Sequence, residues 1–201
     1  MNEIMARKLT NDRALRIVAA ATEEFSTRGF YGARVDHIAR RAAVNKQLLF
    51  YYYHSKRGLF HATLARATAA LERSLETVAI PPGRPLDRIR DALSAQFDFL
   101  IHHPELVALI SHAGRSDAAP FGPAIKRLVV LLAEGQGRGQ VRDDLDPHLA
   151  AAQALVLMVG YLKLEELIAA SAPPLGADEP ALRERWKHAA VELVVNGVRV
   201  P

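Results

Sequence analysis

The stretch AAVNKQLLFYYYHSK, residues 42–56, places three consecutive tyrosines beside cationic and amide side chains. Successive residues of an α-helix lie about 100° apart around its axis, so the three rings cannot share one face. At least one aromatic ring must therefore point away from the core. Lys can donate to guanine, Gln can pair with adenine, and an aromatic edge can touch a thymine methyl group. This combination of side chains is suited to the major groove of DNA.

These residues predict a short helix over Lys46–Tyr53, with Asn45 as its N-cap. A helix over residues 35–42 precedes it, and the tight turn between them predicts a helix-turn-helix with an outward second helix. The same residues also fit an aromatic-rich helix that only packs within the protein. At 100° per residue, one side of the second helix carries Lys46, Gln47, Phe50 and Tyr51, and the other carries Leu48, Leu49 and Tyr52.

The charge of the chain is concentrated near its start. Residues 1–60 contain eleven Lys and Arg against five Asp and Glu, a net charge of +6 within the formal total of +4. Residues 61–201 have a net charge of −2. A basic segment on a near-neutral remainder favours contact with a polyanion, although an ordinary solvated surface gives the same count.

Several classes of protein are disfavoured by the sequence. The chain contains no cysteine, which excludes disulfides, cysteine-ligated zinc and thiol nucleophiles. The longest apolar run, residues 149–162, is shorter than the roughly 18 residues that a membrane span needs. The phosphate-binding loop, zinc-protease, nucleophile-elbow and dinucleotide-binding motifs are absent from the sequence. We therefore expect a soluble cytoplasmic protein that is not an enzyme and that has no cofactor and no metal site.

Helical periodicity and capping residues continue along the chain and predict an all-α fold. Gly29 is expected to end the first helix, and Ser55 to cap a fourth helix that runs to about residue 79. The proline-rich residues 80–85 predict a linker. Valine-rich residues 191–200 favour a strand by propensity, but a lone strand has no partner in such a fold. The later helices are expected at 85–102, 104–113, 120–138, 147–170 and 180–197, with Asp146 capping the fourth of them.

Residues 11–60 resemble the DNA-binding domain of the TetR family of transcriptional regulators. The resemblance lies in FSTRGF (25–30), VDHIA (35–39), AAVNK (42–46) and LFYYYHSK (49–56). It implies a three-helix helix-turn-helix domain over residues 1–60 and a helical ligand-binding and dimerisation domain over residues 61–201. It also implies a homodimeric regulator, a repressor in the simplest case, that binds a palindromic double-stranded DNA operator and is released by a small-molecule effector.

The resemblance also assigns roles to residues. Lys46, Gln47 and Leu48 lie where family members contact bases, and Phe50 to Tyr52 and Lys56 lie where they hold phosphates. Family members commonly carry Thr or Ser at the start of the second helix and Gly in the turn, where this chain has Ala33-Arg34 and Ala43. The predicted DNA-binding residues are Arg34, Asn45, Lys46, Gln47, Leu48, Phe50, Tyr51, Tyr52 and Lys56.

The remainder of the chain allows two interpretations. The apolar helix 147–170 and an apolar stripe on helix 180–197 predict a four-helix dimer interface, but they would also fit one monomer's core. The stripe consists of Leu182, Trp186, Ala189, Ala190, Leu193 and Val194. The predicted ligand-binding residues are Phe97, His102, His112, Phe121 and Tyr161, and an ordinary core with polar residues at its edge would contain the same types. The alternative function is a helical protein-binding adaptor, or a small-molecule-binding protein without sequence-specific DNA binding.

Overall fold

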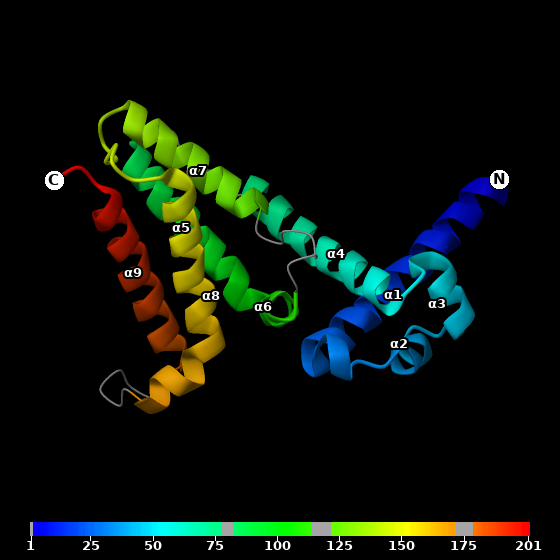
Figure 1. The fold of residues 1–201 in the computed structure, drawn as a ribbon. Coiled ribbons are helices and arrows are strands. Elements are labelled where there is room, and N and C mark those ends of the chain that lie inside the picture. The colour runs from blue at the N-terminus through cyan, green and yellow to red at the C-terminus, as the bar shows by residue number, and fades with distance from the viewer. Residues whose placement is uncertain (1, 78–82, 114–121, 172–178) are drawn as a thin grey trace. The chain divides into compact units, whose positions relative to one another are not determined.

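The computed structural model describes residues 2–77, 83–113, 122–171 and 179–201, and every regular element within those ranges is a helix (Figure 1). The predicted all-α class is confirmed. The predicted linker residues 80–82 and the first two residues of the predicted helix 120–138 lie outside these ranges. The helices are α1 (Asn2–Gly32), α2 (Val35–Arg41), α3 (Lys46–Tyr53), α4 (Lys56–Thr77), α5 (Pro85–His102), α6 (Pro104–Ser111), α7 (Gly122–Gly137), α8 (Pro147–Ser171) and α9 (Glu179–Val198).

The chain packs as two compact units. The first comprises Met1–Ala70 and Pro104–Pro120, and the second comprises Leu71–His103 and Phe121–Pro201. The helix-turn-helix segment of the predicted 1–60 domain lies wholly within the first unit, which continues into α4 and also contains α6. The sequence analysis had placed α6 with the second domain, since α6 follows α5 along the chain.

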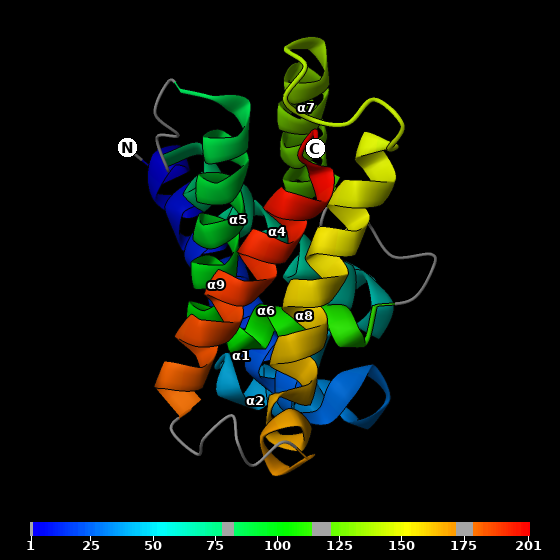
Figure 2. The ribbon, with the colours of Figure 1, turned by 90° about the vertical axis from the view of Figure 1, so that its left-hand side faces the viewer.

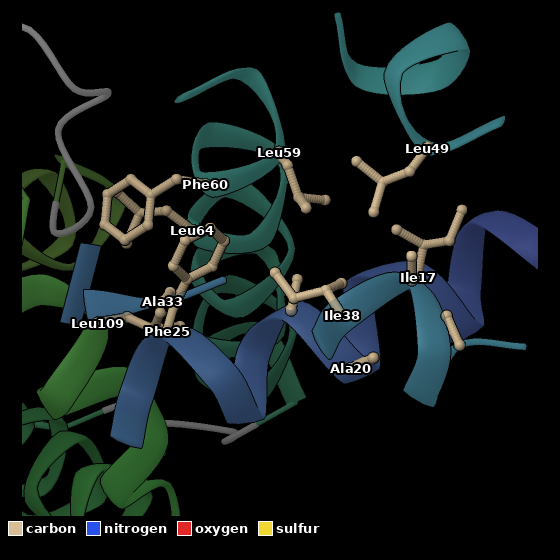
Figure 3. Packing of buried hydrophobic residues seen from close by; sticks show 13 residues of the cluster. Ile17, Ala20, Phe25, Ala33, Ile38, Leu49, Leu59, Phe60, Leu64 and Leu109 are labelled. Carbon is tan, nitrogen blue, oxygen red and sulfur yellow. The ribbon is translucent and has the colours of Figure 1, made fainter. Parts of the chain in front are cut away.

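An apolar core holds the helices of the first unit together (Figure 3). Phe25 of α1 is fully buried, and its ring meets that of Phe60 from α4 edge-on, with 5.1 Å between the ring centroids. Leu49 of α3 is fully buried in the same core. Leu109 of α6 also joins it, although it is distant in sequence. The two short helices α2 and α3 are thus anchored to two longer ones.

Gly29 interrupts α1, as the sequence predicted, with φ 68° and ψ 174°. This left-handed φ is readily adopted only by glycine. The position is also crowded by His112, the residue that follows α6, because a Cβ atom at Gly29 would lie 2.9 Å from the His112 ring. Glycine is therefore needed here for two reasons. It allows the left-handed backbone conformation, and it leaves room for the His112 ring.

The local signals of the helix-turn-helix act as expected. The Asn45 side chain accepts a hydrogen bond from the Leu48 N–H at 2.7 Å, so the predicted N-cap of α3 is confirmed. Ser55 Oγ accepts from the Gly58 N–H at 2.9 Å at the start of α4. In the turn, Ala43 takes the place of the usual glycine and adopts φ 53°, a strained value for a residue with a side chain.

The second unit is a bundle of α5, α7, α8 and α9, in which α9 lies between α5 and α8 (Figure 2). Asp146 caps α8 as predicted, because its carboxylate accepts from the His148 N–H at 2.7 Å. The valine-rich end of the chain is helical to Val198, and only Arg199 pairs with Val141 in an isolated antiparallel bridge. Burial of one face of α9 overrides the local preference of valine for strands.

The strained turn gives a stability prediction. Replacing Ala43 with Gly should leave the free energy of unfolding unchanged or raise it by up to about 1 kcal/mol, because relief of the left-handed φ outweighs the added freedom of glycine in the unfolded chain. Ala42→Gly is the matched control. Ala42 is buried with φ −73°, so this change should cost about 1 kcal/mol. Chemical denaturation followed by circular dichroism measures both. Equal destabilisation by the two changes would show that the turn is not strained.

Candidate nucleic-acid interface

Helix α3 has one buried side chain that fixes it to the core and several exposed polar side chains. Leu49 is fully buried, whereas Lys46, Gln47 and Tyr51 are exposed. The Tyr51 side chain is 76% exposed, the value expected of a ring that contacts something outside its own unit. These three side chains belong to the face that the sequence analysis predicted to point outward.

The other aromatic residues of α3 pack inward to differing degrees. Tyr52 and Tyr53 are partly buried against the core, and the Tyr53 hydroxyl donates to the Ala14 carbonyl at 3.3 Å. Burial raises the pKa of Tyr53. Phe50 also packs against this core, although it was expected on the outward face. It lies only about 100° from Leu49 around the helix, so its ring can reach the same apolar surface. Of the three consecutive tyrosines, Tyr51 is exposed, whereas Tyr52 and Tyr53 are partly buried.

Lys46 is held by an acidic residue of the preceding helix. Its Nζ atom lies 3.0 Å from Oδ1 of Asp36, and both side chains are about half exposed. The hydrogen bond from Lys46 lowers the pKa of the Asp36 carboxyl. Sequence reasoning did not find Asp36. The sequence does contain a hint of its role, because Asp36 is an acidic residue in the first turn of a helix within an otherwise basic segment.

Lys56 connects the first turn of α4 to the end of α1. Its ammonium donates to the Tyr31 carbonyl at 3.2 Å and lies 5.1 Å from the centroid of the Phe30 ring. The guanidinium of Arg57 lies 5.3 Å from the same centroid. Two cations therefore lie close to one aromatic ring at the N-terminus of a helix, where a phosphate group is also favoured.

The start of α2 is capped from another helix. Arg34, at the N-cap, uses no side-chain bond of its own, but its backbone N–H donates to Glu24 of α1 at 2.9 Å. Glu24 is 8% exposed and lies 3.5 Å from Arg28 and 3.4 Å from His37. Glu24 thus fixes the N-cap residue itself, whereas a Thr or Ser at that position would accept from an N–H group in the first turn of α2. The available signal was that Glu24 falls seven residues after the buried Ile17, on the core face of its helix.

Two of the five predicted ligand-binding residues lie close together in the second unit. Phe97 and Tyr161 are buried in the second unit, and their ring centroids are 6.1 Å apart. Trp186, which had been predicted only as part of the α9 stripe, stacks on Tyr161 at 4.5 Å. His102 is exposed on α5, and His112 belongs to the first unit. Phe121 lies outside the described residues.

Helices α8 and α9 expose several large apolar side chains. Val156 is 69% exposed, Leu167 is 62% exposed and Leu193 is 64% exposed. Val156 and Leu193 also line a groove between the two helices with a volume of about 670 Å³. The predicted stripe of α9 is not one face, because Leu182 and Ala190 are buried in the monomer's core while Leu193 points outward.

The described residues show neither a metal-binding cluster nor a membrane-spanning helix. Within the described ranges, His, Asp and Glu residues form no group of three that is arranged to hold a metal ion. None of the helices in the same ranges combines the length and the apolar character needed to cross a membrane.

The sequence of the first unit is similar to that of known bacterial regulatory proteins. The family profile described as bacterial regulatory proteins, tetR family, matches residues 17–63, which run from α1 to the first turns of α4. The HTH-type transcriptional repressor NicS of Pseudomonas putida is 29% identical over 139 residues, 64% of this chain and 66% of that protein. The HTH-type transcriptional repressor SCO4008 of Streptomyces coelicolor is 33% identical over 137 residues, 65% of this chain and 68% of that protein.

These two matches span about two thirds of the length of each relative. Likeness to a solved structure extends further. The crystal structure of SCO4942 from Streptomyces coelicolor, a protein assigned as a transcriptional regulator, has a TM-score of 0.69 and 29% sequence identity. It covers 93% of this chain and 98% of that one. The likeness therefore includes the helices of both units.

The interface predicts two kinds of binding defect. Gln47→Ala should cost about 1–3 kcal/mol on the true binding site and much less on random DNA, because base contacts carry discrimination. Lys56→Ala should weaken binding to all sequences and reduce the salt slope by about one unit, since one fewer phosphate is neutralised. Fluorescence anisotropy on specific and scrambled duplexes across a salt series measures both. If both variants lost affinity equally on both duplexes, the assignment of base and phosphate contacts would be wrong.

Proposed function

The chain belongs to the TetR family of bacterial regulatory proteins, and on this premise we propose that it is a transcriptional repressor that binds a palindromic DNA operator as a homodimer and is released by a small-molecule ligand. One observation carries the proposal. The exposed start of α3 presents Lys46 and Gln47, while the buried Leu49 fixes the helix from behind. A bacterial operator lies in the cytoplasm, which is where the proposal places the protein.

The proposed partner in the dimer is a second copy of this chain, seated on α8 and α9. Exposed Leu149, Val156, Leu164 and Leu167 follow one another at helical spacing along α8, and Leu193 adds to them from α9. Gly160 lies within this row, and a Cβ atom built on it meets open space. A symmetric dimer would bury the same surface on both subunits, and a two-fold protein matches a palindromic site.

The proposed ligand site is the aromatic stack of the second unit. Phe97, Tyr161 and Trp186 come from three different helices, α5, α8 and α9. The indole N–H of Trp186 is buried and has no hydrogen-bond partner within the described residues. An apolar ligand with one acceptor would suit this environment. Release from DNA then requires that the ligand bind better to a form that is unsuited to the operator.

The alternative is a helical adaptor that binds only protein. The exposed apolar surface of α8 and α9 favours it, since such surfaces mark interaction sites of any kind. An adaptor function would not account for the exposed polar side chains of α3. Selection of duplexes from a random DNA library by the wild-type protein separates the two functions, because an adaptor would enrich no sequence.

Ligand control predicts a reciprocal effect. A ligand that weakens operator binding by a given factor must itself bind more weakly by that same factor when operator DNA is present. Isothermal titration of a compound that releases the protein from the selected duplex, with and without that duplex, measures the two factors. A compound that displaced DNA while binding free and DNA-bound protein equally well would contradict this mechanism.

The dimer predicts a change in mass on a single substitution. Leu193→Glu should yield monomers or aggregates, because an unpaired charge buried in an interface costs several kcal/mol, on the order of 3–5. Val130→Glu on α7 is the matched control, since Val130 is 58% exposed and lies outside the lining of the groove. Light scattering coupled to gel filtration at micromolar concentration gives the masses. A monomeric wild-type protein would refute the proposed dimer.

A further inference from the structure

We propose that Asp36 is a positioning residue for DNA recognition, and that its carboxylate fixes the direction from which Lys46 approaches the base edges. This inference rests on the proposed DNA-binding function. It adds a residue of the first recognition-motif helix, α2, to those of α3. The observation behind it is the 3.0 Å separation between Lys46 Nζ and Asp36 Oδ1.

Lys46 needs such a partner if it is to distinguish bases. A lysine ammonium is a compact charge on a flexible four-carbon stem, and it can meet a phosphate as easily as a guanine. The ammonium has three donors. A hydrogen bond to Asp36 uses one of them and leaves two, which matches the O6 and N7 acceptors that guanine presents in the major groove. The ion pair thus converts a mobile charge into a directed pair of donors.

Asp36 lies on a backbone that is well fixed. Ile38 and Ala39, which follow it on α2, are 1% and 5% exposed. The Arg34 N–H, at the start of the helix, is held by Glu24 of α1. The carboxylate therefore stands on an anchored helix, and its position does not depend on the flexible side chain that it holds.

Asp36 is proposed to favour specific binding by positioning Lys46, but its negative charge should oppose non-specific binding. A carboxylate beside the recognition helix repels phosphates, so it should weaken binding to DNA of any sequence. Removal of this charge should strengthen binding to random DNA. Loss of positioning should at the same time lower the preference for the true site. These two effects have opposite signs, so one pair of duplexes can separate them.

The test uses the full chain and two duplexes, one selected from a random library by the wild-type protein and one with the same bases shuffled. Asp36→Asn should raise affinity for the shuffled duplex and lower the ratio of specific to shuffled affinity about threefold to fivefold, the range for a well-oriented exposed ion pair. Glu23→Gln is the matched control. It removes one carboxylate from the same unit, where Glu23 pairs with Arg41, and it should leave the ratio unchanged.

A double-mutant cycle shows whether Asp36 acts through Lys46. In the Lys46→Met background, Asp36→Asn should no longer change the ratio. Asp36→Glu keeps the charge but moves the carboxylate, so it should lower the ratio without changing affinity for the shuffled duplex. This second variant provides a test even if Asp36→Asn fails to fold, which thermal unfolding of each variant would reveal.

Three results would overturn the proposal. If Asp36→Asn and Glu23→Gln raised both affinities alike, Asp36 would be only a local charge. If Asp36→Asn lowered the ratio as much in the Lys46→Met background as in the wild type, it would not act through Lys46. If the wild-type protein enriched no sequence from the library, the proposed function would fail, and this inference would fail with it.

Discussion

The burial of Leu49 is the contact on which the proposed DNA interface depends. Helices α2 and α3 have seven and eight residues, and isolated helices this short are not stable in water. Their geometry must therefore come from the core that Leu49 shares with Phe25 and Phe60. Once Leu49 is inside, the helical repeat places Gln47 and Tyr51 on the opposite side of α3, about 160° away from it. Lys46, the first residue of the helix, is exposed as well. The polar face and the apolar anchor are two consequences of one placement.

Local signals were enough to predict much of the fold. The bounds of α3 and α5 and the caps at Asn45 and Asp146 agree with the sequence analysis, because each depends on residues within one turn of the helix end. The contribution of α6 to the first unit was not predicted. Leu109 reaches that core through tertiary packing, which no local pattern encodes.

The candidate site was predictable in its outline but not in its contacts. Outward Gln47 and Tyr51 follow from helical periodicity, because both lie opposite the buried Leu49. The inward packing of Phe50 depends on how much apolar surface its neighbours offer. The contacts made by the carboxylates of Glu24 and Asp36 were not predicted, for a related reason. Each acts on a residue ten positions away, on or at the start of another helix, where sequence spacing gives no guide to distance.

The small size of the outward face favours recognition by the proposed dimer. The two polar side chains proposed to contact bases, Lys46 and Gln47, would give about 2–6 kcal/mol of discrimination per subunit at about 1–3 kcal/mol each. Specific recognition typically requires about 4–10 kcal/mol over non-specific binding. Two subunits on a palindromic site would double the first figure and reach that range. One subunit alone would reach only the lower part of that range, so the exposed apolar side chains of α8 and α9 fit a function in which a second subunit supplies the rest.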